Sequence, residues 1–196
     1  MINCKKGGIA VDYVDFMEMN TNQLHLRKVR REDAPRFFCF AGSEAVTKYM
    51  FWKPHADVNE SVASIEKTLS RYAQGNCWRW GIALKETDEL VGIIDLLGID
   101  ETTRSSTFAY MLAEEFWGRG FATEALTAVL GFAFDRLGLE TVWAEHFGPN
   151  GASGAVMRKA GMKYIGTEPG KYEKNGITYD VPQYRITREE WKCSNS

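Results

Sequence analysis

A glycine-rich turn near the middle of the chain joins a strand-like segment to a helix-like segment. Apolar and polar residues alternate over 107–112, as in a half-buried strand, and the sequence then reads Trp117-Gly118-Arg119-Gly120-Phe121-Ala122-Thr123-Glu124-Ala125. Glycines let a backbone approach a ligand closely, and the first N–H groups of a helix lack intrahelical partners. With the helix dipole and the Arg119 cation, this pattern predicts a site for a cofactor that carries a pyrophosphate.

The turn differs from the common nucleotide-binding sequences. It has no Gly-Lys-Ser/Thr, so it is not a P-loop. The dinucleotide fingerprint needs three glycines at fixed spacing, whereas here Gly118 and Gly120 are followed by Ala122. The alternative is that the turn connects a strand to a helix without binding any ligand.

Length and composition indicate one domain. A chain of 196 residues with 44% hydrophobic residues can bury a self-sufficient core. A polar break at 20–22 separates residues 1–20, which we expect to be an N-terminal appendage, from a single domain over 21–191. The net charge of −2 argues against a nucleic-acid-binding surface.

Neither a metal site nor a membrane segment is predicted. The four cysteines are widely scattered and form no Cys-x-x-Cys pair, and the three histidines have no metal-triad spacing. No apolar run approaches the ~20 residues that span a bilayer, and acidic residues interrupt the N-terminal segment where a signal peptide would be apolar. We therefore expect a cytoplasmic protein.

The predicted element order is β-α-α-β-β-β-α-β-α-β-β, which is typical of a mixed α/β or α+β fold. The longest predicted helix has one apolar face and follows the turn. The strands are expected near 24–29, 77–84, 90–97, 105–112, 141–147, 164–167 and 183–187.

The turn and a second motif together resemble the GNAT superfamily of N-acetyltransferases. The acetyl-CoA motif of that family, Arg/Gln-x-x-Gly-x-Gly/Ala, is filled by residues 117–122, with Trp117 in place of Arg or Gln. That replacement is usual in the branch of ribosomal-protein N-terminal acetyltransferases. The second motif resembles that branch's Asn-x-x-Ser…Leu-x-Lys-x-Gly-Phe and comprises Asn150, Ser153, Val156, Met157, Lys159, Gly161 and Met162.

The resemblance implies a sheet of mostly antiparallel strands, flanked by helices and splayed open between 105–112 and 141–147. Acetyl-CoA would lie in the opening, with its pyrophosphate on the amides of 118–123. An amide near the end of the first strand could also polarise the thioester carbonyl. The implied cofactor-binding residues are Met111, Leu112, Trp117, Gly118, Arg119, Gly120, Phe121, Ala122, Thr123, Asn150 and Ser153.

The implied reaction is direct attack of an amine on the thioester within a ternary complex. Many members of the family use a tyrosine as the proton donor, but Met157 stands at that position. The resembled branch uses a serine, which corresponds to Ser153; the alternative is that Ser153 is an ordinary first-turn helical serine. Asn150 would hydrogen-bond the pantetheine arm, cap the helix, or do both.

The general base stays open among several candidates. Glu145 is the first, and Glu173 or Tyr172 in the C-terminal loop are others. His146 alternates with Glu145, so the two side chains cannot both face the cleft. A chain of water molecules could replace a side-chain base altogether.

The acceptor is an amine of unassigned class. A peptide α-amine, with a pKa of about 8, needs less help from a base than a lysine at about 10.4. A small amine is the alternative, and an anionic cleft would favour a polyamine. Residues considered for the acceptor pocket are Phe51, Trp52, Trp78, Trp80 and Asp95. The alternatives are core packing for the aromatic residues, which is favoured for Trp80, and a buried hydrogen-bonding role for Asp95.

Two other functional classes compete with an enzyme. One is a non-catalytic acyl-CoA-binding sensor, and the other is an unrelated α/β binding module without affinity for CoA. The family resemblance also makes a homodimer plausible, but the residues themselves do not indicate one.

Overall fold

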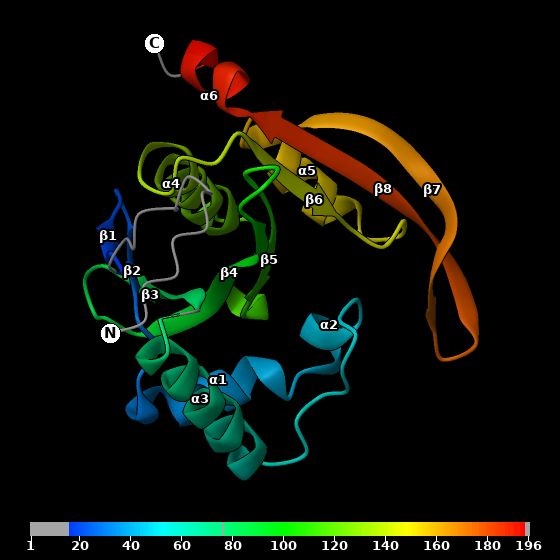
Figure 1. Cartoon of the computed structure of the whole chain (residues 1–196). Coiled ribbons are helices and arrows are strands. Elements are labelled where there is room, and N and C mark those ends of the chain that lie inside the picture. The colour runs from blue at the N-terminus through cyan, green and yellow to red at the C-terminus, as the bar shows by residue number, and fades with distance from the viewer. Residues whose placement is uncertain (1–15, 76, 195–196) are drawn as a thin grey trace, which may run out of the picture.

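A single mixed sheet organises the computed structural model, which describes residues 16–75 and 77–194 (Figure 1). The described residues form eight strands in the order β1-β2-β3-β4-β5-β6-β8-β7. Their bounds are β1 (Met19–Asn20), β2 (Leu24–Arg27), β3 (Trp78–Leu84), β4 (Leu90–Asp100), β5 (Ser105–Leu112), β6 (Thr141–Glu145), β7 (Lys163–Lys174) and β8 (Ile177–Thr187).

The sheet opens between β5 and β6. These two strands pair in parallel over only three residue pairs, from Ser105↔Thr141 to Thr107↔Trp143. Every other neighbouring pair in the sheet is antiparallel. Beyond Thr107, β5 continues to Leu112 without a strand partner on the β6 side. The expected splayed, mostly antiparallel sheet is confirmed.

Helices cover both faces of this sheet. Residues of α3 line a cavity over one face together with Phe37 of α1, whereas α4 packs its Phe132 against Trp80 on the other. The helix bounds are α1 (Ala34–Ala41), α2 (Glu44–Thr47), α3 (Val58–Ala73), α4 (Phe121–Asp135), α5 (Gly151–Lys159) and α6 (Arg188–Ser194), with short 3₁₀ turns at η1 (Arg31–Asp33) and η2 (Glu114–Phe116).

The main core lies between the sheet and α4. Leu126, Val129 and Ala133 on one side of α4 are completely buried. Trp78 and Trp80 both pack against Phe132 of α4, with ring centroids 5.1 and 5.2 Å away. Alternation along β3 turns both tryptophans toward the α4 core, which is the alternative to an acceptor-pocket role and the one favoured for Trp80.

The N-terminal segment joins the sheet. β1 pairs with β2, and the Trp80 indole donates a hydrogen bond to the Met17 carbonyl at 2.8 Å. The Phe16 ring lies 5.2 Å from that of Trp80. The packing therefore shows no break at residue 20, and residues 1–15 of the expected appendage lie outside the described residues.

Candidate functional site

The glycine-rich turn offers an open cradle at the start of α4. Gly118 and Gly120 have φ angles of 74° and 85°, in the left-handed region that glycine tolerates best. A Cβ on either would meet no atom within 4 Å, so the space in front of the turn is open. Gly120 caps α4 without a side chain, and the helical ladder starts with the Glu124 amide donating to the Gly120 carbonyl at 3.0 Å. The amides of 121–123 therefore lack helical acceptors and fit an anion such as a pyrophosphate.

Aromatic residues fix the conformation of this turn. The Arg119 guanidinium lies 4.8 Å from the centre of the Phe121 ring and 5.3 Å from that of Phe116. The Trp117 indole donates a hydrogen bond to the Leu112 carbonyl at 2.8 Å, while half of the residue stays exposed. Trp117 thus ties the turn to the end of β5, a role that an Arg or Gln at this position would not fill in the same way.

The open edge of β5 faces the gap in the sheet. The Ala113 amide donates to the Val91 carbonyl in the direction of β4. Because backbone groups alternate along an antiparallel strand, those of Leu112 and Tyr110 point the other way, into the gap. Met111 pairs with Ile93 of β4 instead, and its side chain lines a cavity. Of the two residues expected to pair with pantetheine, Leu112 offers its backbone to the gap.

Ser153 lies across this gap from β5. Its hydroxyl is 3.2 Å from the hydroxyl of Tyr110, and its amide donates to the Asn150 side chain at 3.4 Å. Asn150 therefore caps α5, as one of the two readings of this residue predicted. Burial raises the pKa of Tyr110, and the hydrogen bond with Ser153 opposes that rise only in part. Tyr110 is thus a protonated neighbour that can support the Ser153 hydroxyl.

Glu145 is held by two neighbours. Its carboxylate lies 2.7 Å from Lys171 Nζ and accepts a hydrogen bond from the Tyr172 hydroxyl. Burial, and then this bond, raise the pKa of Tyr172, while the bond with Glu145 raises the pKa of Lys171. Tyr172 therefore stays protonated at neutral pH. Part of the proton-accepting capacity of Glu145 is already in use.

The two other base candidates lie apart from this cluster. His146 is buried, and its Nδ1 is 2.8 Å from the Phe147 carbonyl oxygen. Its Nε2 approaches Gly154 of α5, on the side of β6 opposite to Glu145, as alternation predicts. Glu173 is exposed and follows Tyr172 in β7, so its side chain faces the other side of that strand.

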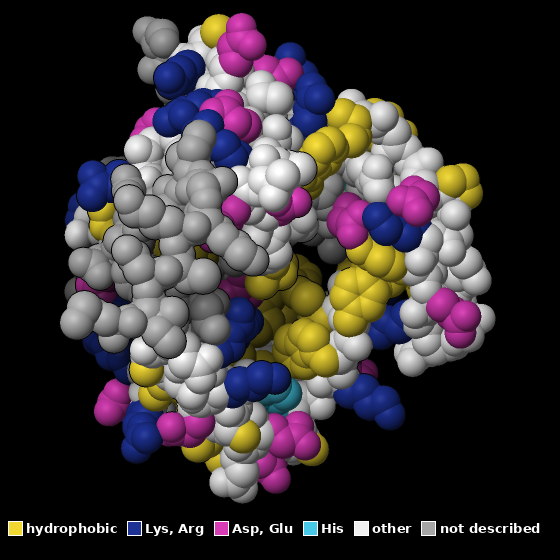
Figure 2. Space-filling model, in the orientation of Figure 1, with side chains coloured by type: hydrophobic (Ala, Val, Ile, Leu, Met, Phe, Trp, Pro, Cys, Tyr) yellow, Lys and Arg dark blue, Asp and Glu magenta, His cyan; other side chains and the backbone are white. Residues whose placement is uncertain are grey.

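A cavity of about 400 Å³ lies on the same face of β5 as Met111. Figure 2 shows a hollow in this region with hydrophobic side chains inside and Lys or Arg at its edge. Phe51 and Trp52, two of the aromatic residues considered for the acceptor pocket, line this cavity. A smaller hollow of about 260 Å³ is lined by Thr107, Trp143, Ala144, Glu145, Lys171 and Gln183.

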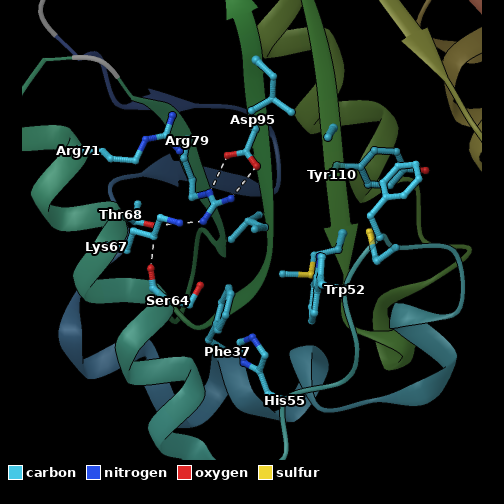
Figure 3. Close-up of a pocket in the computed structure, with 16 residues that line it drawn as sticks. Phe37, Trp52, His55, Ser64, Lys67, Thr68, Arg71, Arg79, Asp95 and Tyr110 are labelled. Atoms are coloured by element: carbon cyan, nitrogen blue, oxygen red, sulfur yellow. Dashed lines mark hydrogen bonds and ion pairs between the residues drawn. The ribbon is translucent and has the colours of Figure 1, made fainter.

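Asp95 is paired with an arginine inside the larger cavity. Its two carboxylate oxygens accept hydrogen bonds from Arg79 at 2.7 and 2.9 Å, and Arg79 also donates to the Thr68 hydroxyl at 3.0 Å (Figure 3). This bidentate pair explains why an acidic residue interrupts an apolar strand. Across residues 16–75 and 77–194 no group of three His, Cys, Asp or Glu side chains is placed to hold a metal ion.

The fold and the cradle define an acyl-CoA-dependent acyltransferase, and comparison with known proteins gives the family. The model of the acetyltransferase (GNAT) domain matches residues 23–163. The chain belongs to this family and is an acetyl-CoA-dependent N-acetyltransferase. None of the helices in the described ranges combines the length and apolar character that crossing a membrane requires.

Proteins similar to this chain are named for different acceptors. The uncharacterized N-acetyltransferase YoaA of Bacillus subtilis is 28% identical over 88% of this chain and 98% of its own length. The spermidine N(1)-acetyltransferase of Vibrio cholerae is 23% identical over 87% of this chain and 96% of its own. The structure of RimL, a ribosomal L7/L12 α-N-protein acetyltransferase solved with coenzyme A, has a TM-score of 0.77 at 19% identity and covers 87% of this chain and 98% of its own.

Proposed function

We propose that acetyl-CoA binds in the gap between β5 and β6, with its pyrophosphate on the amides of 118–123. The observation that most supports this location is the pair of left-handed glycines, Gly118 and Gly120, beside an uncapped helix start. The bound thioester supplies the acetyl group. The backbone amide of Leu112 faces the gap and can hold the pantetheine arm, together with Asn150, whereas the Leu112 carbonyl already accepts from the Trp117 indole.

Ser153 is the proposed proton donor to the departing sulfur. Its hydroxyl lies at the start of α5, facing β5, and Tyr110 supports it from the other side of the gap at 3.2 Å. A thiolate resembles a cysteine side chain, with a pKa near 8.5, so a weak donor is sufficient. Met157 is buried and has no ionisable hydrogen to offer.

The proposed acceptor is a primary amine of low basicity, such as the α-amine of an amino acid or a peptide. Glu145 is the only side chain proposed as base, and Lys171 and Tyr172 already occupy part of its carboxylate. A weakened base favours an amine with a pKa of about 8 over one near 10.4. A protein N-terminus belongs to the favoured class, and a polyamine does not. We place the reaction in the cytoplasm, within a domain that ends near residue 191.

The first test is thermal unfolding with and without acetyl-CoA. A ligand at 100-fold excess over its Kd adds about 2.7 kcal/mol to the free energy of unfolding. For a domain of this size that is a shift of several degrees in Tm. We expect this shift in the wild type and its loss in Gly120→Glu, because the new carboxylate enters the anion cradle.

Gly176→Glu is the matched control. Gly176 also has a left-handed φ, 74°, with open space at its Cβ, but it lies in the turn between β7 and β8. Both variants therefore carry the same backbone strain and the same charge change. Equal loss of the acetyl-CoA shift in the two variants would place the cofactor elsewhere. Binding without transfer to any amine would favour the acyl-CoA sensor.

A further inference from the structure

The larger cavity has one apolar wall that reaches the surface. This wall consists of Phe37, Met50, Phe51 and Trp52, which all line the cavity. Phe51 is 67% exposed, whereas Met50 and Trp52 are partly buried and Phe37 belongs to the core. Leu97, another large exposed hydrophobic residue, lines the same cavity. Large apolar side chains that gather in an exposed hollow indicate a place where an apolar group binds.

Ring contacts hold the apolar wall in a defined shape. The centroid of the Trp52 ring lies 5.2 Å from that of His55, and the His55 centroid lies 5.8 Å from that of Phe37. The His55 Nδ1 is 2.8 Å from the hydroxyl of Ser61, which is completely buried. Figure 3 shows Phe37, Trp52 and His55 together at one end of the cavity. Because these rings are already ordered, an aromatic group can pack on them at a low cost in conformational entropy.

The opposite wall of the cavity is polar. Arg79 pairs with both oxygens of Asp95 and donates to the Thr68 hydroxyl. Figure 3 shows α3 on the side of the cavity away from Trp52. The α3 residues that line the cavity follow i, i+3, i+4 and i+7 spacing: Ser64, Lys67, Thr68 and Arg71. A bound molecule would therefore turn its apolar side toward the apolar wall and its polar groups toward α3.

The cavity contacts the surroundings of both residues proposed for proton transfer. Tyr110 lines the cavity, and its hydroxyl lies 3.2 Å from that of Ser153. The Phe51 ring packs edge-on against the Tyr172 ring, with 4.6 Å between centroids, and the Tyr172 hydroxyl donates to Glu145. An amine held between Ser153 and Glu145 would therefore have the apolar wall within reach of its side chain.

We propose that the acceptor is an amine with an aromatic side chain, which packs against Phe51 and Trp52 on the apolar wall. This inference rests on the proposed transferase function and names the class of its acceptor, for example a peptide whose first residue is aromatic. The cavity volume of about 400 Å³ lies in the range of small-molecule sites. A polyamine such as spermidine has no bulky apolar group, so it would leave the apolar wall exposed to water.

The test is calorimetric binding to the protein saturated with coenzyme A. The ligands are phenylalanine amide, leucine amide and alanine amide, which carry the same α-amine and the same charge and differ only in the side chain; spermidine is a fourth ligand. We expect phenylalanine amide to bind about 10-fold more tightly than alanine amide, with leucine amide between them, because more apolar area is buried. Equal binding of the three amides, or tightest binding by leucine amide or spermidine, overturns the proposal.

Two variants assign the preference to the cavity. Ala109 is exposed on β5 and lines the cavity, so Ala109→Leu fills part of it and should reduce the preference for phenylalanine amide below about 2-fold. Phe51→Ala removes the most exposed ring of the wall and should reduce the preference about 3-fold. Tyr164→Ala is the matched control, because Tyr164 is 54% exposed on β7 and does not line the cavity. A preference that survives unchanged in Ala109→Leu or Phe51→Ala, or falls equally in the control, contradicts the assignment.

Heat capacity provides a check that needs no variant. Burial of apolar area makes the heat-capacity change of binding negative, so this change should be more negative for phenylalanine amide than for alanine amide. Equal values would contradict burial on the apolar wall. Mass spectrometry of the same amides with acetyl-CoA tests the proposed function separately. A binding preference without any N-acetyl product would refute transfer and keep the apolar site, whereas products without the preference would refute only the aromatic class.

Discussion

The two ends of the proposed site are built in different ways. The proposed cofactor end consists of backbone: the amides at the start of α4, the left-handed turn at Gly118 and Gly120, and the open edge of β5. The proposed acceptor end consists of side chains from α3, β3, β4 and the loop before α3, which lie far apart in the sequence. One end is thus specified by conformation and the other by residue identity. Substitutions at the acceptor end can change the acceptor without disturbing the acetyl-CoA site.

The largest effect that tests this division is expected at Ser153. Ser153→Ala removes the proposed proton donor, and we expect kcat to fall about 100-fold, as for other general acids. The Kd of acetyl-CoA, measured by calorimetry, should change less than about 2-fold, because the backbone carries that binding.

Tyr110→Phe gives the comparison for this variant. It removes only the hydroxyl that lies 3.2 Å from Ser153, so the fall in kcat should be smaller. Unchanged turnover in Ser153→Ala, with a large loss in Tyr110→Phe, would transfer the donor role to the tyrosine. A large loss of acetyl-CoA affinity in either variant would break the division between the two ends.

A smaller effect is expected for Lys174, which contacts the loop that carries Phe51 and Trp52. Lys174 of β7 donates hydrogen bonds to the carbonyls of Thr47, Lys48 and Met50, at 2.9, 3.0 and 2.6 Å. Burial lowers the pKa of Lys174. These bonds hold the loop that carries Phe51 and Trp52. We expect Lys174→Met to raise the KM for the acceptor about 5-fold, because Phe51 and Trp52 would be held less firmly at the proposed acceptor end.

The control for this loop variant is Lys163→Met on the same strand. Lys163 is 65% exposed and pairs with Glu190, away from the loop. Steady-state kinetics should show no change in its acceptor KM. If Lys174→Met instead weakens acetyl-CoA binding and leaves the acceptor KM unchanged, the loop belongs to the cofactor end.

The smallest expected effect is on stability and concerns Glu124, which connects α4 to the segment before β2. Glu124, in the first turn, accepts hydrogen bonds from the Thr21 hydroxyl at 2.6 Å and the Gln23 amide at 2.7 Å. Burial acts to raise the pKa of Glu124, but these bonds outweigh it and the pKa is lowered. A carboxyl with a lowered folded-state pKa stabilises the protein above its unfolded pKa of about 4.3, and this contribution is lost as the pH falls through the folded value.

Glu124→Gln should therefore lower Tm by about 2 °C at pH 7, with the difference from wild type shrinking below about pH 4. Glu189→Gln, at an exposed carboxylate in the first turn of α6, should leave Tm unchanged. The Kd of acetyl-CoA should stay within about 2-fold of wild type. A tenfold loss of acetyl-CoA affinity would show that the backbone cradle depends on a distant side-chain contact. That result would contradict a cofactor end specified by backbone conformation alone.

Much of the fold and the cofactor cradle could be predicted because the signals are local. Alternation marks β5, glycines mark the turn, and a continuous apolar face marks α4. A helix was predicted from Asn150 to Ala160 with Asn150 as a possible cap, and Asn150 does cap α5 there. Alternation also correctly separated Glu145 from His146.

The acceptor end could not be predicted because its contacts join segments far apart in the chain. Tyr110 was missed because 43 residues separate it from Ser153 in the sequence, while their hydroxyls lie 3.2 Å apart in the structure. The polar i, i+3, i+4, i+7 pattern of α3 was a usable signal, but a solvated helix face has the same pattern. The sequence left Trp78 open between core and pocket, because an aromatic residue suits both, and only its contact with Phe132 decides for the core.

The three residue pairs that join β5 to β6 have a consequence for aggregation. An unpaired strand edge normally invites another chain to add to the sheet, so proteins place charges or bulges along such edges. Here the unpaired edge lies within the sheet, beside β6, and Ser153 contacts Tyr110 across the gap. It is therefore not an outer edge of the sheet, where a strand of another chain would add. Backbone hydrogen-bonding groups on this edge can therefore stay available to a ligand without promoting self-association through this edge.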